Sequence, residues 1–248
     1  MPDIEQCREF LRNHLWKQWQ TLETDQRKNK PQPALQKALP PDAKLIDLVA
    51  PQDLTLGQMP LMEALQRRES RREYNEKPLT LEELSFLLWS TQGVREVISE
   101  GQVVLRTVPS AGARHPFETY LLVNRVAGLE RGVYRYLALE HKLCWLASYA
   151  SRAKAAEAAC PGFVGDGAVV FIWSVIPYRT EWRYGVISPK LIALDAGHVC
   201  QNLYLACEAI GAATCAVGAY DQDAMDELID VDGLEEFTIY IAPVGKVR

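Results

Sequence analysis

LIALDAGHVCQNLYLACEAI, residues 191–210, is the stretch that decides the fold of this chain. Its side chains are mostly apolar, and the run is long enough for several helical turns. Gly211 follows directly and suits the C-terminus of a helix, because glycine adopts the left-handed conformation at little cost. A helix with so few charged side chains is usually buried. The sequence therefore predicts one central helix with the other elements packed around it.

Short runs rich in β-branched and aromatic residues lie on both sides of this helix in the chain, which is typical of β-strands. We expect strands at residues 119–123, 132–136, 142–146, 168–176 and 237–244. We expect further helices at residues 61–68, 80–92, 151–160 and 221–228. Thr80 and Glu83 form a capping-box pattern at the start of the second. Because strands and helices do not alternate regularly, the fold class is α+β, a mixed or antiparallel sheet flanked by helices.

We expect residues 1–60 to form an N-terminal arm and residues 61–248 to form the folded domain. Residues 7–24 place apolar side chains at spacings of three and four, so we expect an amphipathic helix that docks on the body or on a second subunit. Residues 25–60 are rich in proline, lysine, asparagine and glutamine, a composition typical of an extended connector on the surface.

The composition excludes several classes of function. The chain has 248 residues, of which 48% are hydrophobic and 24% charged, as in globular proteins. A net charge of -5 argues against a partner that is nucleic acid or an anionic membrane. Neither a signal peptide nor an apolar run of about 18 residues is present, and the six cysteines lack CxxC spacing. We therefore expect a cytoplasmic protein with unpaired thiols.

The strongest chemical signal is RRESRREY, residues 67–74. Its four arginines stand in an otherwise acidic protein, and guanidinium groups bind phosphate oxygens in pairs. Ser70 adds a hydroxyl donor in the middle. The alternative is a solvated basic stretch at the C-terminus of a helix, where cations are favoured by the helix dipole.

Three further segments carry small residues or cations at the ends of predicted elements. Residues 109–112 (PSAG) precede a strand, and Gly112 allows the backbone to lie close to a flat ligand. Residues 214–221 (TCAVGAYD) follow the central helix and offer backbone amides. Residues 243–248 (PVGKVR) end in two cations. Each segment alone is more often an ordinary turn or strand end.

In this order the four segments resemble the flavin-dependent nitroreductase family, and more narrowly its SagB-type dehydrogenase branch, which includes azoline oxidases of peptide natural-product pathways. The resemblance covers about residues 60–248. It rests on Arg68-x-Ser70-x-Arg72-x-Tyr74 and on residues 109–116 (PSAGARHP), 195–198 (DAGH) and 243–246 (PVGK). It implies a nitroreductase-like fold and a homodimer with FMN in each of two sites at the subunit interface.

The resemblance also assigns roles to residues of this chain. The FMN phosphate would be held by Arg68, Ser70, Arg72, Lys246 and Arg248. The wall along the isoalloxazine would be formed by Pro109, Ser110, Ala111 and Gly112. The backbone at Val217, Gly218 and Ala219 would reach the N5 and O4 edge of the ring. We expect no metal, because Asp195 and His198 lack a third ligand. NAD(P)H, if it serves as electron donor, would stack on the flavin, since no Rossmann loop is present.

Arg183-Tyr184 stands where the SagB-type branch carries a Lys-Tyr pair implicated in azoline oxidation. That oxidation passes a hydride to flavin N5 and releases a proton, which needs a base. Arg183 stays protonated, so Tyr184 is the remaining candidate if its pKa is well below about 10. Ile187 stands where the branch tends to carry an arginine. The alternative for Arg183 and Tyr184 is a solvent-facing polar pair beside a turn.

Three functions remain open on the sequence. The first is a dehydrogenase that acts on a small-molecule or peptide-derived ring and transfers hydride through flavin N5. The second is an NAD(P)H-dependent reductase of nitro compounds or quinones. The third is a flavin-binding protein whose catalysis has lapsed, which Arg183 and Ile187 suggest.

Overall fold

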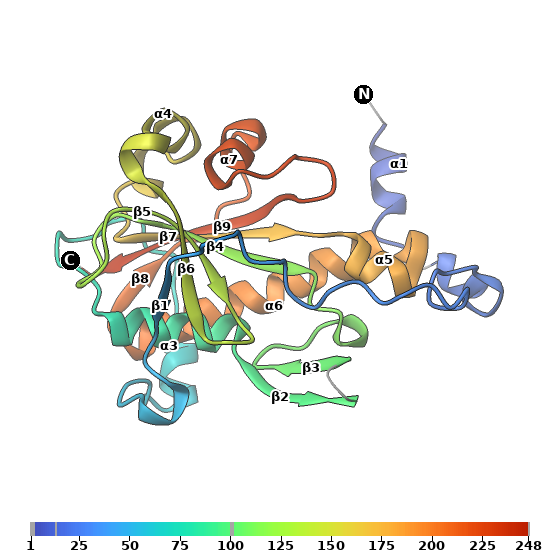
Figure 1. The fold of residues 1–248 in the computed structure, drawn as a ribbon, viewed down its shortest axis with the longest axis horizontal. Helices are drawn as coiled ribbons and strands as arrows, with labels where there is room; N and C mark the ends of the chain where they lie inside the picture. The colour runs from blue at the N-terminus through green and yellow to red at the C-terminus, as the bar shows by residue number, and fades with distance from the viewer. Residues whose placement is uncertain (1–2, 13, 100–101, 248) are drawn as a thin grey trace.

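The computed structural model describes residues 3–12, 14–99 and 102–247, and its centre is a seven-stranded sheet (Figure 1). The strand order is β1-β6-β5-β4-β7-β9-β8, and all of these pairings are antiparallel. The strands are β1 (Leu45–Asp47), β4 (Phe117–Val123), β5 (Gly132–Leu137), β6 (Lys142–Ser148), β7 (Val169–Val175), β8 (Ala212–Thr214) and β9 (Phe237–Lys246). A separate hairpin pairs β2 (Val94–Ile98) with β3 (Val103–Arg106). The predicted α+β class with an antiparallel sheet is confirmed.

Helices cover both faces of this sheet, with α3 and α6 on one side and α4 and α7 on the other (Figure 1). The α-helices are α1 (Ile4–Glu9), α2 (Leu61–Arg67), α3 (Leu81–Gln92), α4 (Tyr149–Ala159), α5 (Tyr178–Tyr184), α6 (Ser188–Ala209) and α7 (Gln222–Ile229). Short 3-10 helices are η1 (His14–Thr21), η2 (Pro51–Asp53), η4 (Ala111–Ala113), η5 (Gly162–Val164) and η6 (Gly185–Ile187).

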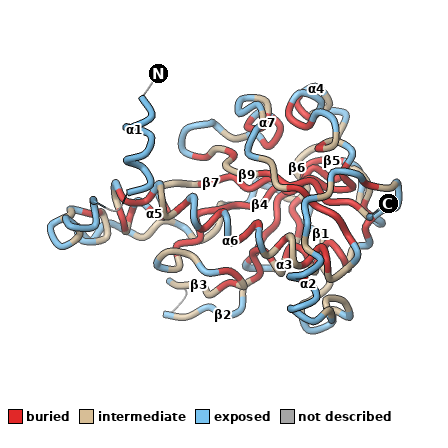
Figure 2. The backbone as a smooth tube through the Cα atoms, turned by 180° about the vertical axis from the view of Figure 1, so that it is seen from behind, coloured by how far each residue is buried: buried red, intermediate tan, exposed pale blue. Residues whose placement is uncertain are grey.

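The sheet separates two hydrophobic cores, because successive side chains of a strand point to opposite faces. In β4, Leu121 packs with Leu203 of α6 in the first core. Its neighbour Tyr120 packs with Leu228 of α7 in the second. In Figure 2 the buried backbone is concentrated in the strands between the helix layers.

The predicted central helix is present as α6. It begins at Ser188, three residues earlier than expected, because Pro189 is well suited to the first turn of a helix. Gly211 follows its end with φ +63°, as predicted for a left-handed residue. The capping box of Thr80 and Glu83 at the start of α3 is also present. No helix of the described residues is long and apolar enough to cross a membrane.

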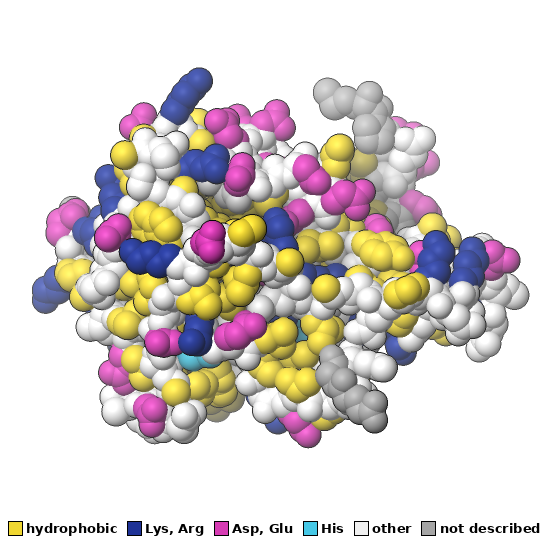
Figure 3. All heavy atoms as spheres, in the orientation of Figure 1, with side chains coloured by type: hydrophobic (Ala, Val, Ile, Leu, Met, Phe, Trp, Pro, Cys, Tyr) yellow, Lys and Arg dark blue, Asp and Glu magenta, His cyan; other side chains and the backbone are white. Residues whose placement is uncertain are grey.

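The predicted amphipathic helix over residues 7–24 is wrong. The structure has two shorter pieces there, α1 and η1, and neither contains a buried residue. Phe10 and Leu15 are 45% and 42% exposed. Because the apolar side chains of this segment pack so little against the rest of the chain, a single long helix is not stabilised here. Figure 3 shows apolar side chains on the part of the surface occupied by η1 and α5, with Lys and Arg side chains beyond them.

The arm contributes more to the fold than a connector. β1 lies at the edge of the sheet and pairs with β6. The proline-rich composition of residues 25–60 did not predict this strand. Arg27 Nη1 donates to the carbonyls of Trp19 and Leu22, and Trp182 Nε1 of α5 donates to the carbonyl of Lys30. The Arg27 bonds hold the N-terminal segment together, and the Trp182 bond attaches it to α5.

Candidate active site

The arginine-rich segment after α2 is anchored to the fold by Arg71. The Arg71 Nη1 atom lies 2.5 Å from Oε1 of Glu208, a buried residue of α6. The Arg71 amide donates to the carbonyl of Thr214 at the end of β8. The hydrogen bond with Glu208 raises the pKa of Arg71, so this guanidinium stays charged and holds the segment in place.

Arg68 and Ser70 meet Tyr204, which also lies on α6. Ser70 Oγ is 2.9 Å from Tyr204 Oη, and the guanidinium carbon of Arg68 is 5.4 Å from the centroid of the Tyr204 ring. The guanidinium carbon of Arg72 is 5.8 Å from the Phe163 ring centroid. No ion pair among the described residues involves Arg68 or Arg72. Both guanidiniums therefore keep donors for an anionic ligand.

Tyr204 also joins this segment to the one after β8. Its hydroxyl accepts a hydrogen bond of 2.8 Å from the amide of Ala216, and the amide of Val217 donates to Ile241 of β9. Gly218 and Ala219 are exposed, and the space that a Cβ of Gly218 would occupy is open. Backbone held by these hydrogen bonds thus lies beside the arginine-rich segment with room for a ligand, as a flavin with its phosphate at the arginines would require.

Lys246 has a different environment from Arg68 and Arg72. Its Nζ contacts the carboxylate of Glu83 at the start of α3 and lies 3.3 Å from the carbonyl of Ile210. A cation that is already paired offers less to an anionic ligand than the unpaired guanidiniums of Arg68 and Arg72 do. Arg248, the other predicted C-terminal cation, lies outside the described residues.

The loop of residues 109–112 is held by Asp195, nearer the N-terminal end of α6. Ser110 Oγ donates to Oδ2 of Asp195 over 2.6 Å, and the Ala111 amide donates to the same oxygen over 3.1 Å. Pro109 is exposed, and Gly112 has φ +57°. Burial raises the pKa of Asp195. The sequence offered Asp195 only as an incomplete metal ligand and did not predict that it holds this loop. The described residues contain no cluster of three potential metal ligands.

The same loop contacts the Arg183-Tyr184 pair. A Cβ on Gly112 would lie 2.7 Å from Tyr184 Oη and 2.8 Å from Arg183 Nε, so only glycine allows this close approach. Tyr184 is buried, and its ring centroid lies 6.2 Å from that of Trp16 and 5.6 Å from that of Trp19. The interpretation as a solvent-facing pair is therefore wrong for Tyr184. The structure brings the predicted ring wall and the predicted catalytic pair together.

Two arginines make this end of the site electropositive. Arg114 is buried and lies over Trp182, with 5.3 Å from its guanidinium carbon to the ring centroid. The Nε atoms of Arg114 and Arg183 are buried without a hydrogen-bond partner in the described part of the chain. Burial, and then the charge of Arg183, lower the pKa of Arg114. Ile187 is buried, and its aliphatic side chain adds no charge where the SagB-type branch tends to carry an arginine. Donors without partners next to positive charge suit an anionic or polar ligand.

The two parts of the candidate site are separated along one helix. Asp195 holds the loop of residues 109–112 and Tyr204 holds Arg68 and Ser70, nine residues apart on α6. At 1.5 Å per residue this separation is about 13 Å. One chain therefore presents the predicted phosphate-binding residues and the predicted ring-wall loop at different places along α6.

Similarity to known proteins identifies the family. The chain is 33% identical over 192 residues to a protein named as a nitroreductase in Methanocaldococcus jannaschii, covering 77% of this chain and 93% of that one. It is 31% identical over 122 residues to the trifolitoxin-processing protein TfxB of Rhizobium leguminosarum bv. trifolii, covering 45% of this chain and 31% of that one.

A solved structure shows the same fold. The crystal structure of a Ralstonia eutropha protein named as a nitroreductase superposes with a TM-score of 0.68 and 24% identity, over 88% of this chain and 98% of that one. The model of the nitroreductase family matches residues 65–246, which run from the last residues of α2 to the end of β9 and include every described residue of the candidate site except the N-terminal tryptophans. With its arginine-rich segment, its glycine loop and its antiparallel sheet, this chain belongs to the nitroreductase family, an oxidoreductase family in which relatives use flavin.

Proposed function

We propose that this protein is an FMN-dependent oxidoreductase that works as a homodimer. One observation carries the proposal: Tyr204 brings Arg68, Ser70 and the backbone before Gly218 to one place. Guanidiniums without a carboxylate partner suit the phosphate, and exposed backbone beside them suits the polar edge of a flat ring. FMN, when bound, supplies hydride transfer at N5.

The residues of this chain bind and orient that group. Arg68 and Arg72 would hold the phosphate, with Ser70 adding a hydroxyl. Backbone amides at residues 217–219 would orient the N5 and O4 edge. The loop of residues 109–112, held by Asp195, would cover the ring and exclude water from it.

The separation along α6 supports a site built by two chains. Tyr204, which contacts the predicted phosphate-binding residues, and Asp195, which holds the ring-wall loop, are about 13 Å apart along the helix axis. If a second copy supplies residues 109–112 next to Arg68 and Arg72, both groups meet on one ligand. The two-fold symmetry of a dimer then creates two equal sites.

For the substrate we propose a peptide-derived or other small ring that is dehydrogenated. The likeness to a protein named for trifolitoxin processing favours a peptide-derived substrate. Tyr184 Oη lies against the ring-wall loop at Gly112, where its phenolate form would accept the proton that dehydrogenation releases. Arg183 and Arg114 supply positive charge next to it. Arg183 itself has no acceptor atom and cannot serve as the base.

Reduction of nitro compounds or quinones with NAD(P)H is the second candidate, because the M. jannaschii relative is named as a nitroreductase. Anaerobic mixing of flavin-loaded protein with NADPH or NADH separates the two. Rapid bleaching of the flavin band supports the reductase. Slow bleaching with either nucleotide, together with bleaching by an azoline-containing peptide, supports the dehydrogenase. Bleaching by none of them supports a flavin-binding protein without catalysis, and a protein that stays colourless after reconstitution overturns FMN binding.

Tyr184→Phe tests the proton-holding role. We expect unchanged flavin content and a lower rate of peptide dehydrogenation, with a changed dependence of that rate on pH. Tyr178→Phe on the same helix is the matched control, because the Tyr178 hydroxyl bonds to Asp25 on the arm, outside the candidate site. Equal rates and pH profiles in both variants would remove Tyr184 from the mechanism.

A further inference from the structure

A cavity of 440 Å³ lies on the α4 and α7 side of the sheet, on the opposite face from the candidate site on α6. Its volume falls within the range of ligand pockets, about 300 to 1,000 Å³. The walls come from β4, β5, β6 and α7, and one rim is formed by residues 37–40 of the arm. Apolar side chains form much of the lining, including Leu39, Val133, Leu146, Leu228 and Ile229.

Arg135 of β5 lines this cavity and is 2% exposed. It shares a sheet face with Val133, and its register partner on β4 is Tyr120. Its Nη2 donates to the carbonyl of Ala38 over 2.8 Å, but its Nε has no hydrogen-bond partner among the described residues. No ion pair in the described part of the chain includes Arg135. A buried guanidinium without an anion is costly, and an anionic ligand beside it would offset that cost.

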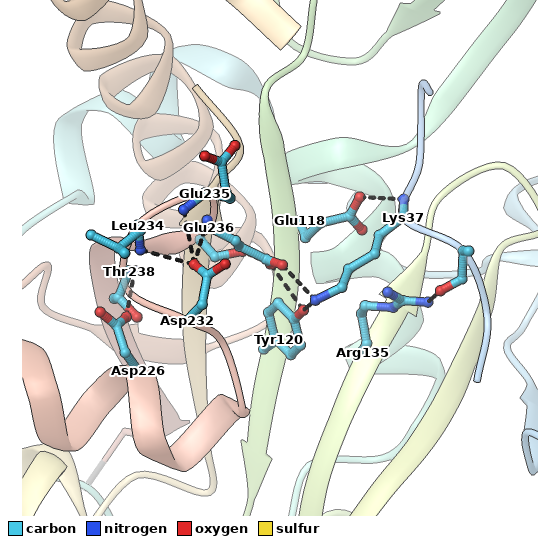
Figure 4. A network of polar contacts seen from close by, with 12 residues as sticks. Lys37, Glu118, Tyr120, Arg135, Asp226, Asp232, Leu234, Glu235, Glu236 and Thr238 are labelled. Carbon is cyan, nitrogen blue, oxygen red and sulfur yellow. Dashed lines mark hydrogen bonds and ion pairs between the residues drawn. The ribbon is translucent and has the colours of Figure 1, made fainter. Parts of the chain in front are cut away.

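The other cations of the lining are already compensated. Lys37 Nζ lies 2.5 Å from Oε2 of Glu236 and 3.3 Å from Tyr120 Oη. Arg152 Nη2 lies 3.2 Å from Oδ2 of Asp230. Figure 4 shows the Lys37 side chain directed at Tyr120 and Glu236, while the Arg135 guanidinium is directed at the arm. Arg135 is therefore the cation of this lining that an entering anion would meet without displacing a carboxylate.

We propose that this cavity binds a small organic acid with an apolar body. The carboxylate would pair with Arg135, and the body would lie against Leu146, Leu228 and Ile229. One uncompensated guanidinium suits a singly charged carboxylate, and the apolar walls exclude an ion such as acetate as the full ligand. Residues 37–40, tied to the sheet through Lys37 and Ala38, close one side of the site. This site is independent of the flavin chemistry proposed above.

Octanoate is the probe for the test, with octanol and acetate as comparisons. Isothermal titration of the full-length purified protein at pH 7 should show saturable binding of one octanoate per chain. Octanol lacks the charge and acetate lacks the chain, so each should bind at least tenfold more weakly. Equal binding of octanol and octanoate would reject the role of Arg135, and failure of octanoate to bind would reject the site.

Arg135→Met removes the guanidinium, and Arg131→Met, at an arginine that does not line the cavity, is the matched control. We expect octanoate to bind at least tenfold more weakly to Arg135→Met and unchanged to Arg131→Met. If Arg135→Met does not fold, Ala147→Phe keeps the arginine and fills the cavity from its wall, and it should also abolish binding. Unchanged octanoate binding in Arg135→Met or in Ala147→Phe would overturn the proposal. Flavin content should be equal in all of these variants.

Discussion

Ser70 Oγ and Tyr204 Oη lie 2.9 Å apart, although 134 positions separate the two residues in the chain. The Tyr204 hydroxyl also accepts a hydrogen bond from the amide of Ala216, so one phenol links two segments of the candidate site. Tyr204→Phe removes both bonds. Because a hydrogen bond contributes about 1 kcal/mol, we expect FMN to bind about three- to tenfold more weakly.

The measurement for Tyr204→Phe is the quenching of FMN fluorescence on titration with flavin-free protein. Tyr149→Phe on α4 is the matched control and should bind FMN like the wild type. An unchanged affinity in Tyr204→Phe would mean that the two segments hold their places without this phenol.

Arg68→Ala and Arg72→Ala should each lower the affinity for FMN by about tenfold or more, because removing one partner of a charged hydrogen bond costs about 1.5 to 3 kcal/mol. Arg67→Ala is the control, since Arg67 pairs with Glu63 on α2.

Lys246→Ala should reduce the thermal stability more than the flavin affinity, because its Nζ contacts Glu83. A greater loss of FMN in Lys246→Ala than in Arg72→Ala would reverse our assignment.

The sequence was sufficient for the elements whose signal is local. The capping box at Thr80, the apolar run of α6 and the glycine after it each encode their structure within a few residues. The β1 strand was not predictable in this way, because its three residues become a strand only through pairing with β6. The division of this segment into α1 and η1 likewise depends on tertiary contacts of its apolar side chains, which the local sequence does not specify.

The same distinction applies to the candidate site. Arg68, Ser70 and Gly112 could be predicted as site residues because their motifs are contiguous in the sequence. Tyr204 and the role of Asp195 as holder of the ring-wall loop were missed, because both depend on contacts between residues far apart in the chain. A tyrosine in a helix carries no sign that its hydroxyl bridges two loops. The burial of Tyr184 by Trp16 and Trp19 was missed for the same reason.

His115, three residues after the ring-wall loop, should make the protein less stable in mild acid. Burial, and then the charge of Arg106, lower the pKa of His115 from 6.5 to about 3. The stabilisation is fully present above pH 6.5 and is lost as the pH falls toward 3, because only the unfolded chain takes up the proton. From pH 7 to pH 5 this loss is about 2 kcal/mol.

The test compares urea unfolding at pH 7 and pH 5. His115→Gln should lose about 2 kcal/mol less than the wild type between the two values. His198→Gln, at an exposed position of α6, should follow the wild type. The same pH dependence in His115→Gln and the wild type would show that other groups cause the loss.

Subunit complementation tests whether two chains build each site. Arg72→Ala damages the phosphate side, whereas Gly112→Val damages the ring-wall loop, because a Cβ there would clash with Tyr184 and Arg183. Each variant alone should retain little flavin.

If residues 109–112 come from the second copy, a mixed dimer has one site with both defects and one intact site. After refolding of an equal mixture about half of the dimers are mixed, so FMN content should recover to about a quarter of the wild-type value. If one chain supplied both parts, every site would carry one defect, and the mixture would bind no more flavin than the separate variants.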